Sequence, residues 1–162
     1  MSKACVQVIC GNGNGKTTAA IGKGIKAIAH EKTVTMIQFL KGNSEADVLE
    51  VLKRLEPEMK VFRFEKYTDL FEYLTDYQKQ EELVNIRNGL NFAKKVITTG
   101  GCDLIILDEI LGLVDQQLIK VDELKSLIEI RPDDMEMIIT GKVFPEALRE
   151  FVDNITKIED IK

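Results

Sequence analysis

Residues 5–18 decide the fold, and they read CVQVICGNGNGKTT. The apolar run at the start of this stretch predicts a short strand that ends at a cluster of glycines. The next segment places Ile21, Ile25 and Ile28 at helical spacing and ends near His30. The stretch therefore predicts a strand, a glycine-rich loop and a helix, in that order.

The glycine-rich loop has the features of a phosphate-binding P-loop. Glycines allow backbone N–H groups to converge on phosphate oxygens, and the helix N-terminus adds the positive end of its dipole. Lys16 supplies a point charge, and the Thr17 hydroxyl can ligate Mg²⁺. Cys10 stands where the strict pattern GxxxxGK[ST] has its first glycine, so the loop is a variant. A glycine-rich turn with a chance lysine is the alternative, which the order of elements disfavours. The loop residues predicted to bind a nucleoside triphosphate are Gly11, Asn12, Gly13, Asn14, Gly15, Lys16, Thr17 and Thr18.

A second apolar run, residues 104–109, ends in two acids and reads LIILDE. A buried strand that ends in an acid is common in any α/β sheet. This run therefore indicates a functional site only in combination with the glycine-rich loop upstream. Carboxylates at this place can hold a nucleotide-bound metal ion, directly or through water. We therefore predict a metal site made by Thr17 with Asp108 or Glu109.

The rest of the chain alternates short β-branched runs with helical periodicity, which predicts an α/β fold with a mostly parallel sheet flanked by helices. The 162 residues allow one domain, spanning 1–162. Residues 65–76 have no clear pattern, and such a segment is a natural place for a substrate loop. The further strands expected are 32–39, 61–64, 103–108, 135–140 and 155–158, and the further helices are 44–55 with Ser44 as N-cap, 77–97, 121–130 and 145–152.

Composition excludes several classes of function. The 27 acidic residues outnumber the 22 basic ones, giving a net charge of −5, so no overall field attracts nucleic acid or anionic lipid. Charged residues interrupt every long apolar run, which speaks against a membrane span. The N-terminus has no secretory cleavage pattern, so we expect a cytoplasmic protein. The three cysteines form no CxxC pair, and neither a disulfide framework nor a zinc knuckle is indicated.

These motifs together resemble the ATP:corrinoid adenosyltransferases, a family with a RecA-like P-loop fold. The likeness spans nearly the whole chain. It is carried by Gly11 to Ala20, Gln38-Phe39-Leu40-Lys41-Gly42, Leu107-Asp108-Glu109, Arg131-Pro132, Thr140-Gly141, Pro145, Leu148 and Asp153.

The resemblance implies that the cobalt of a reduced corrinoid attacks the 5′ carbon of ATP and that inorganic triphosphate leaves. The nucleotide would lie in reversed orientation, with its 5′ carbon toward the corrinoid. Lys41 and Lys142 would join the loop in binding ATP, and Lys16 and Glu109 would be the catalytic residues. The departing polyanion requires neutralisation by Lys16, Mg²⁺ and the loop amides rather than a protein base. The family also implies a flavoprotein reductant as partner and a homodimer.

The sequence departs from the family pattern at several positions. Asn14 stands where the family usually has lysine, and Lys142 where it has arginine, which keeps the charge but loses a bidentate fork. The chain has no tryptophan, although the family's loop after the third strand normally carries one. The aromatic residues available there, which could wall an apolar corrinoid pocket or belong to the core, are Tyr67, Phe71, Tyr73 and Tyr77.

Two other functions fit the same nucleotide site. A P-loop ATPase or nucleotide-dependent regulatory module is one, because an acid such as Glu109 beside Asp108 can orient an attacking water. A small nucleoside or nucleotide kinase is the other, but such enzymes use an arginine-rich lid and the five arginines here do not cluster. His30, at the expected end of the first helix, suits a capping or dipole role better than catalysis.

Overall fold

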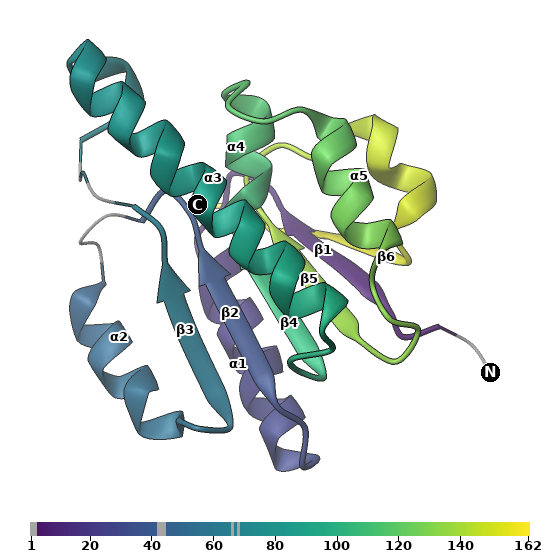
Figure 1. Ribbon diagram of the computed structural model, residues 1–162. Helices are drawn as coiled ribbons and strands as arrows, with labels where there is room; N and C mark the ends of the chain where they lie inside the picture. Colours follow the sequence, from purple (N-terminus) through teal and green to yellow (C-terminus); the bar gives the residue numbers. More distant parts are fainter. Residues whose placement is uncertain (1–2, 42–44, 66, 68) are drawn as a thin grey trace.

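The computed structural model describes residues 3–41, 45–65, 67 and 69–162, and its centre is a six-stranded sheet (Figure 1). The strand order is β3-β2-β4-β5-β1-β6, and every neighbouring pair is parallel. This confirms the expected α/β class with a parallel sheet. The strands are β1 (Val6–Cys10), β2 (Val34–Gln38), β3 (Met59–Arg63), β4 (Leu104–Asp108), β5 (Glu136–Thr140) and β6 (Asn154–Lys157).

The helices follow the expected order with three differences. A 3₁₀ helix over residues 146–151 replaces the helix expected over 145–152, the helix expected over 44–55 ends in a 3₁₀ turn, and α4 was not expected. Six residues are too few to show a helical period, and α4 is apolar enough to be buried from Ile110 to Leu113. The predicted N-cap Ser44 lies outside the described residues. The α-helices are α1 (Lys16–Ala29), α2 (Ala46–Leu52), α3 (Asp76–Thr98), α4 (Ile110–Asp115) and α5 (Val121–Glu129), and the 3₁₀ helices are η1 (Lys53–Leu55), η2 (Phe71–Tyr73) and η3 (Glu146–Phe151).

The ends of the long helices have local causes in the sequence. Thr75 caps α3 by accepting a hydrogen bond from the Gln78 N–H, and the Gln78 side chain accepts one from the Thr75 N–H in return. Beyond the C-terminus of α3, Gly100 takes a φ of 64°, which suits glycine. His30 is the C-cap residue of α1, and its backbone N–H donates to the Ala27 carbonyl at 3.0 Å, while a role for its imidazole stays a prediction. Within the described residues, no helix is both long and apolar enough to cross a membrane.

Both faces of the sheet are covered, which explains why its strands read as continuous apolar runs. In Figure 1, α1 lies behind the sheet and α3 and α5 lie in front. Successive residues of β4 alternate between the two layers: Ile105 and Leu107 pack toward α3 and α5, and Leu104 and Ile106 pack toward α1. Burial on both sides leaves only the strand ends for polar chemistry.

The carboxyl end of the sheet gathers polar side chains. The last residues of four adjacent strands are Arg63 on β3, Gln38 on β2, Asp108 on β4 and Thr140 on β5. Gln38 is in register with both Arg63 and Asp108. Parallel sheets bind their ligands at this edge, because all strands end there together and the loops that follow meet above it.

Candidate nucleotide site

The glycine-rich loop lies between β1 and α1 and packs against the backbone that follows β6. Gly11 has a φ of 112°, and a Cβ atom there would lie 2.3 Å from the carbonyl oxygen of Ile158. The Gly11 N–H donates to the Lys142 carbonyl (2.9 Å), and the Gly13 N–H donates to the Ile158 carbonyl (2.9 Å). Those two amides therefore bond within the chain, whereas the sequence had suggested that the loop amides in general face phosphate.

The part of the loop whose geometry suits an anion is its junction with α1. Gly15 is the N-cap of the helix, with a φ of 102°, and no side chain caps the first turn. The first amides of an α-helix have no intrahelical acceptor, so those of Lys16, Thr17 and Thr18 suit an anion. Lys16 Nζ donates to the Gly13 carbonyl at 2.9 Å, which holds its ammonium over the loop.

Asn14 adds a further contact between the loop and the C-terminal part of the chain, and it uses its side chain as well as its backbone. Its backbone N–H and its side-chain amide donate to the two carboxylate oxygens of Asp160, each at 3.3 Å. Asn12, Asn14, Gly15 and Thr18 are exposed. The predicted loop residues thus differ in their surroundings: Gly11 and Gly13 are buried, whereas Asn14 is exposed and hydrogen-bonded to Asp160.

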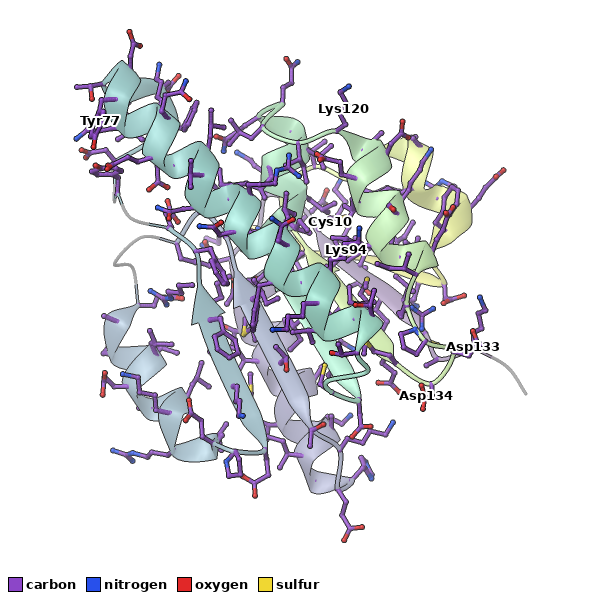
Figure 2. The ribbon with its side chains drawn as sticks, in the orientation of Figure 1. Cys10, Tyr77, Lys94, Lys120, Asp133 and Asp134 are labelled. Atoms are coloured by element: carbon purple, nitrogen blue, oxygen red, sulfur yellow. The ribbon has the colours of Figure 1, made fainter. Side chains whose placement is uncertain are left out.

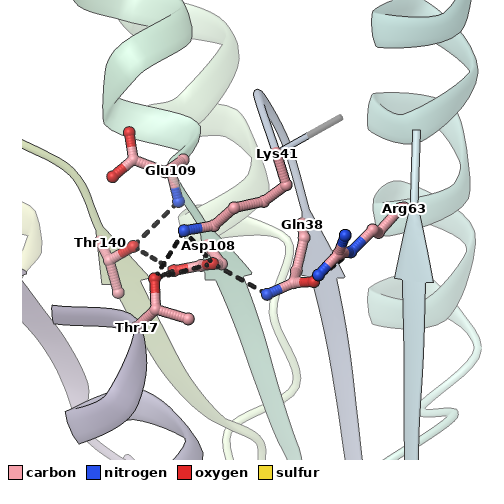
Figure 3. Close-up of polar contacts among 7 residues, drawn as sticks. All are labelled: Thr17, Gln38, Lys41, Arg63, Asp108, Glu109 and Thr140. Carbon is pink, nitrogen blue, oxygen red and sulfur yellow. Dashed lines mark hydrogen bonds and ion pairs between the residues drawn. The ribbon is translucent and has the colours of Figure 1, made fainter. Parts of the chain in front are cut away.

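Asp108 is the centre of a hydrogen-bonded group of side chains at the carboxyl end of the sheet (Figure 3). Its carboxylate is fully buried, so it needs partners to offset the loss of hydration. Thr140 Oγ1 donates to it at 2.7 Å, Thr17 Oγ1 lies 3.1 Å from both carboxylate oxygens, and Gln38 Nε2 donates at 3.1 Å. Lys41 Nζ completes the group, 3.6 Å from Asp108 Oδ2 and 2.9 Å from Thr17 Oγ1.

Arg63 orients this group from one strand further away. Its Nε donates to Gln38 Oε1 at 2.8 Å, which leaves the amide nitrogen of Gln38 facing Asp108. The sequence reasoning assigned no role to Gln38, Arg63 or Thr140. The available signals were polar residues at or next to the ends of the predicted strands and, for Gln38 and Thr140, their place in segments that resemble the family. These signals become specific only when the strand order is known.

Glu109 follows Asp108 but faces another way. It has a φ of 63°, and its N–H donates to Thr140 Oγ1 at 2.9 Å. This turn carries the carboxylate away from the Thr17–Asp108 pair, as Figure 3 shows. Burial raises the pKa of Glu109, and nearby Lys41 opposes that rise. The structure therefore brings Thr17 and Asp108 together, while metal ligation by Glu109 stays a prediction.

Glu109 lines a cavity of about 200 Å³, hereafter the Glu109 cavity. Apolar side chains form part of its wall: Leu40, Leu70, Phe71, Leu74 and Ile86. Its other lining residues are polar: Glu65, Asp69, Glu82, Glu109 and Gln116.

Of the four aromatic residues considered for a corrinoid pocket, Phe71 is the one that lines this cavity. Tyr73 is 75 % exposed and Tyr77 is 72 % exposed, so neither belongs to the core. Figure 2 shows Tyr77 at the outer end of α3, where it lines a separate surface pocket and not the Glu109 cavity. Tyr67 is partly buried, and its hydroxyl contacts Glu81. The alternative that these aromatic residues belong to the core is therefore wrong for Tyr73 and Tyr77, while their contact with a corrinoid stays a prediction.

The donor set at Asp108 suits Mg²⁺. Within the part of the chain that the structure describes, no group of three or more His, Cys, Asp and Glu side chains could hold a metal ion. Mg²⁺ is usually held by one or two protein oxygens together with substrate phosphates and water, so a hydroxyl and a carboxylate are enough. Lys142 is exposed, and its carbonyl accepts a hydrogen bond from the Gly11 N–H at 2.9 Å, so it lies beside the glycine-rich loop. Its charge lowers the pKa of Glu109.

The parallel sheet and the glycine-rich loop define a P-loop protein of the RecA-like type. Two solved structures share the fold. The flagellar accessory protein FlaH from Methanocaldococcus jannaschii has a TM-score of 0.62 and 16 % identity over 97 % of this chain and 72 % of that chain. A KaiC-like protein from Pyrococcus horikoshii OT3 has a TM-score of 0.61 and 15 % identity over 99 % of this chain and 75 % of that chain.

Sequence comparison narrows this class to one family. Residues 2–162 match the family described as ATP:corrinoid adenosyltransferase BtuR/CobO/CobP. The corrinoid adenosyltransferase of Escherichia coli (strain K12) is 28 % identical over 99 % of this chain and 79 % of that protein. Corrinoid adenosyltransferase CobA of Salmonella typhimurium (strain LT2) is 26 % identical over the same shares. The chain belongs to the ATP:corrinoid adenosyltransferase family and is a transferase.

Proposed function

We propose that this protein transfers the 5′-deoxyadenosyl group of ATP to the cobalt of a reduced corrinoid. The cobalt(I) electron pair forms a bond to the 5′ carbon, the bond from that carbon to the phosphate oxygen breaks, and triphosphate leaves with its electrons. The observation that carries the proposal is that the neighbouring side chains of Asp108 and Glu109 face two different places. One of these neighbours contacts Thr17 of the P-loop, and the other lines a partly apolar cavity. This supports a polyphosphate site and a second substrate site that would lie one residue apart.

The phosphate side of the site stabilises the leaving group. The first amides of α1, Lys16, Lys41 and Lys142 supply positive charge, while Thr17 and Asp108 would hold Mg²⁺. When bound, Mg²⁺ neutralises negative charge that develops on the triphosphate. Because the reaction transfers no proton, a general base is not needed. The roles of the loop residues, of Lys41 and of Lys142 in binding ATP are part of this proposal.

The corrinoid would lie at the Glu109 cavity. Phe71, Leu74 and Ile86 offer it an apolar surface. Pockets that enclose drug-sized ligands measure roughly 300–1,000 Å³, and this cavity is smaller. A corrinoid would therefore lie across the mouth and insert only part of its edge. From the family resemblance we also propose a flavoprotein electron donor and a homodimer, and from the chain length a single domain spanning residues 1–162.

An ATPase is the second candidate function, and the environment of Glu109 is the reason to keep it. Burial raises the pKa of this carboxyl, which suits a group that accepts a proton from water. The direction of the Glu109 carboxylate argues against hydrolysis, because this group faces away from the Thr17–Asp108 pair (Figure 3). The two candidates differ in product, because hydrolysis yields ADP and phosphate while adenosyl transfer yields triphosphate.

The test is an anaerobic reaction of the protein with MgATP and chemically reduced cobalamin. We expect a light-sensitive alkyl-cobalt product together with an equal amount of triphosphate. Lys16→Ala should abolish the reaction, while Lys23→Ala, which removes an exposed lysine of the same helix, should leave it unchanged. ADP that accumulates with or without corrinoid, and no alkyl-cobalt product, would overturn the proposal in favour of the ATPase.

A further inference from the structure

The Lys41 ammonium contacts both side chains that we assign to Mg²⁺. Lys41 Nζ lies 2.9 Å from Thr17 Oγ1 and 3.6 Å from Asp108 Oδ2, and Thr17 Oγ1 lies 3.1 Å from each carboxylate oxygen of Asp108. The Lys41 side chain is 16 % exposed and that of Asp108 is 0 % exposed. Figure 3 shows the lysine reaching from the end of β2 toward this pair. The positive charge is thus held close to a buried carboxylate.

An ammonium group and a magnesium ion cannot both occupy this position. Mg²⁺ binds oxygen at about 2.0–2.1 Å, so an ion on Thr17 Oγ1 would lie within a few ångströms of the Lys41 nitrogen. Two positive charges at that distance repel strongly in a site with little water. Either the Lys41 ammonium or the magnesium ion must therefore leave. The cation that stays supplies the counter-charge of Asp108, because a buried carboxylate without a counter-charge is costly.

A displaced Lys41 has negative charge close by. Lys41 Nζ lies 3.6 Å from Asp108 Oδ2, next in the chain to Glu109, and the charge of Lys41 lowers the pKa of the Glu109 carboxyl. The phosphates of a bound nucleotide would add further negative charge at the same edge. Nucleotide binding therefore offsets the cost of moving the ammonium away from Asp108, which free Mg²⁺ alone does not.

We propose that Lys41 is the resident cation of the Thr17–Asp108 pair and that it keeps free divalent metal out of the site until a nucleotide arrives. This inference rests on the nucleotide and metal parts of the proposed function. It makes Lys41 a positioning residue: it holds Thr17 and Asp108 in place in the nucleotide-free protein and makes the binding of metal and nucleotide mutually dependent. The site then discriminates between metal-loaded nucleotide and metal alone.

The first test is thermal unfolding of the nucleotide-free protein with increasing MgCl₂. Wild type should not respond. Lys41→Met should unfold at a lower temperature without metal and gain roughly 3–6 °C once Mg²⁺ exceeds its dissociation constant about tenfold. Lys32→Met is the matched control, because this lysine also pairs with an acid, Glu136, at 3.1 Å. Lys32 precedes β2 and so lies at the amino end of the strands, opposite the proposed site. This control variant should be as insensitive to Mg²⁺ as wild type. Equal responses of wild type and Lys41→Met would overturn the inference.

A second measurement needs no variant. Free Mn²⁺ is counted by its electron paramagnetic resonance signal in the presence of wild-type protein, with and without a non-hydrolysable ATP analogue. Mn²⁺ should stay free without the nucleotide and become bound with it, whereas binding of Mn²⁺ alone would overturn the inference. Neither experiment involves a corrinoid or turnover, so a failure here is distinct from a failure of adenosyl transfer.

Discussion

Thr140→Val tests whether the polar ends of the strands hold the site together. Thr140 is fully buried, donates to Asp108 Oδ1 at 2.7 Å and accepts from the Glu109 N–H at 2.9 Å. Valine has nearly the same shape, so the change removes both hydrogen bonds without leaving a cavity. A hydrogen bond to a charged group contributes about 1.5–3 kcal/mol, and an unpaired buried N–H costs about 1–3 kcal/mol. Because Asp108 keeps its other partners, we expect the free energy of unfolding to fall by about 2–4 kcal/mol.

Urea unfolding followed by circular dichroism measures this change, and thermal unfolding should show a drop of roughly 5–15 °C. Thr140→Ser is the control. It keeps the hydroxyl and loses one methyl group, which costs about 1 kcal/mol. If Thr140→Val stayed within about 0.5 kcal/mol of wild type, or if serine were the more damaging substitution, the hydrogen bonds to Asp108 and Glu109 would not have the structural weight assigned to them.

Three further predictions address the loop, the buried acid and the cavity. Gly11→Ala should lower the free energy of unfolding by more than about 2 kcal/mol because its φ is 112° and its Cβ would meet backbone. Gly22→Ala, in the interior of α1 with nothing within 4 Å, should raise it by about 0.5–1 kcal/mol, and urea titration of both variants checks the contrast. Since burial raises the pKa of Glu109 above 4.5, the folded state holds its proton to higher pH than the unfolded state. Stability is therefore lost as pH rises from 4.5 through the folded pKa, so the stability gained by Glu109→Gln should grow over that window and then level off. A gain that is independent of pH would contradict the burial argument. Phe71→Ala should lower corrinoid-dependent kcat/KM by about tenfold while the exposed Tyr77→Ala leaves it unchanged, and equal effects in a steady-state assay would place the corrinoid elsewhere.

Local patterns predicted the part of the site that depends on neighbours in the chain. The run of glycines before Lys16 and Thr17 requires only the preceding strand and the following helix to present amides to an anion. The acid at the end of β4 could likewise be predicted. A strand that is buried on both faces is a continuous apolar run, so the first charged residue after it marks its end. The fold class and the resemblance to the adenosyltransferase family both rest on signals of this kind.

Other features depend on which strands are neighbours. Gln38 and Arg63 acquire their roles because β2 lies between β3 and β4, in a register that sets their side chains in a row with Asp108. The 3₁₀ helix after Pro145 and the short α4 have too few residues for a periodic pattern. Tyr73 and Tyr77 are exposed, although aromatic side chains suit the wall of a pocket. Burial depends on what packs against a side chain, which the residue type alone does not determine.

By itself the sequence determined a parallel α/β fold with a phosphate-binding loop and an acidic strand end, because each of these is a pattern of consecutive residues. Only the tertiary structure decided that Asp108 faces Thr17 and Lys41 while its neighbour Glu109 lines a cavity. The reason is geometric. A positive φ at Glu109 and a hydrogen bond from its N–H to Thr140, 31 residues along the chain, turn two adjacent carboxylates in different directions.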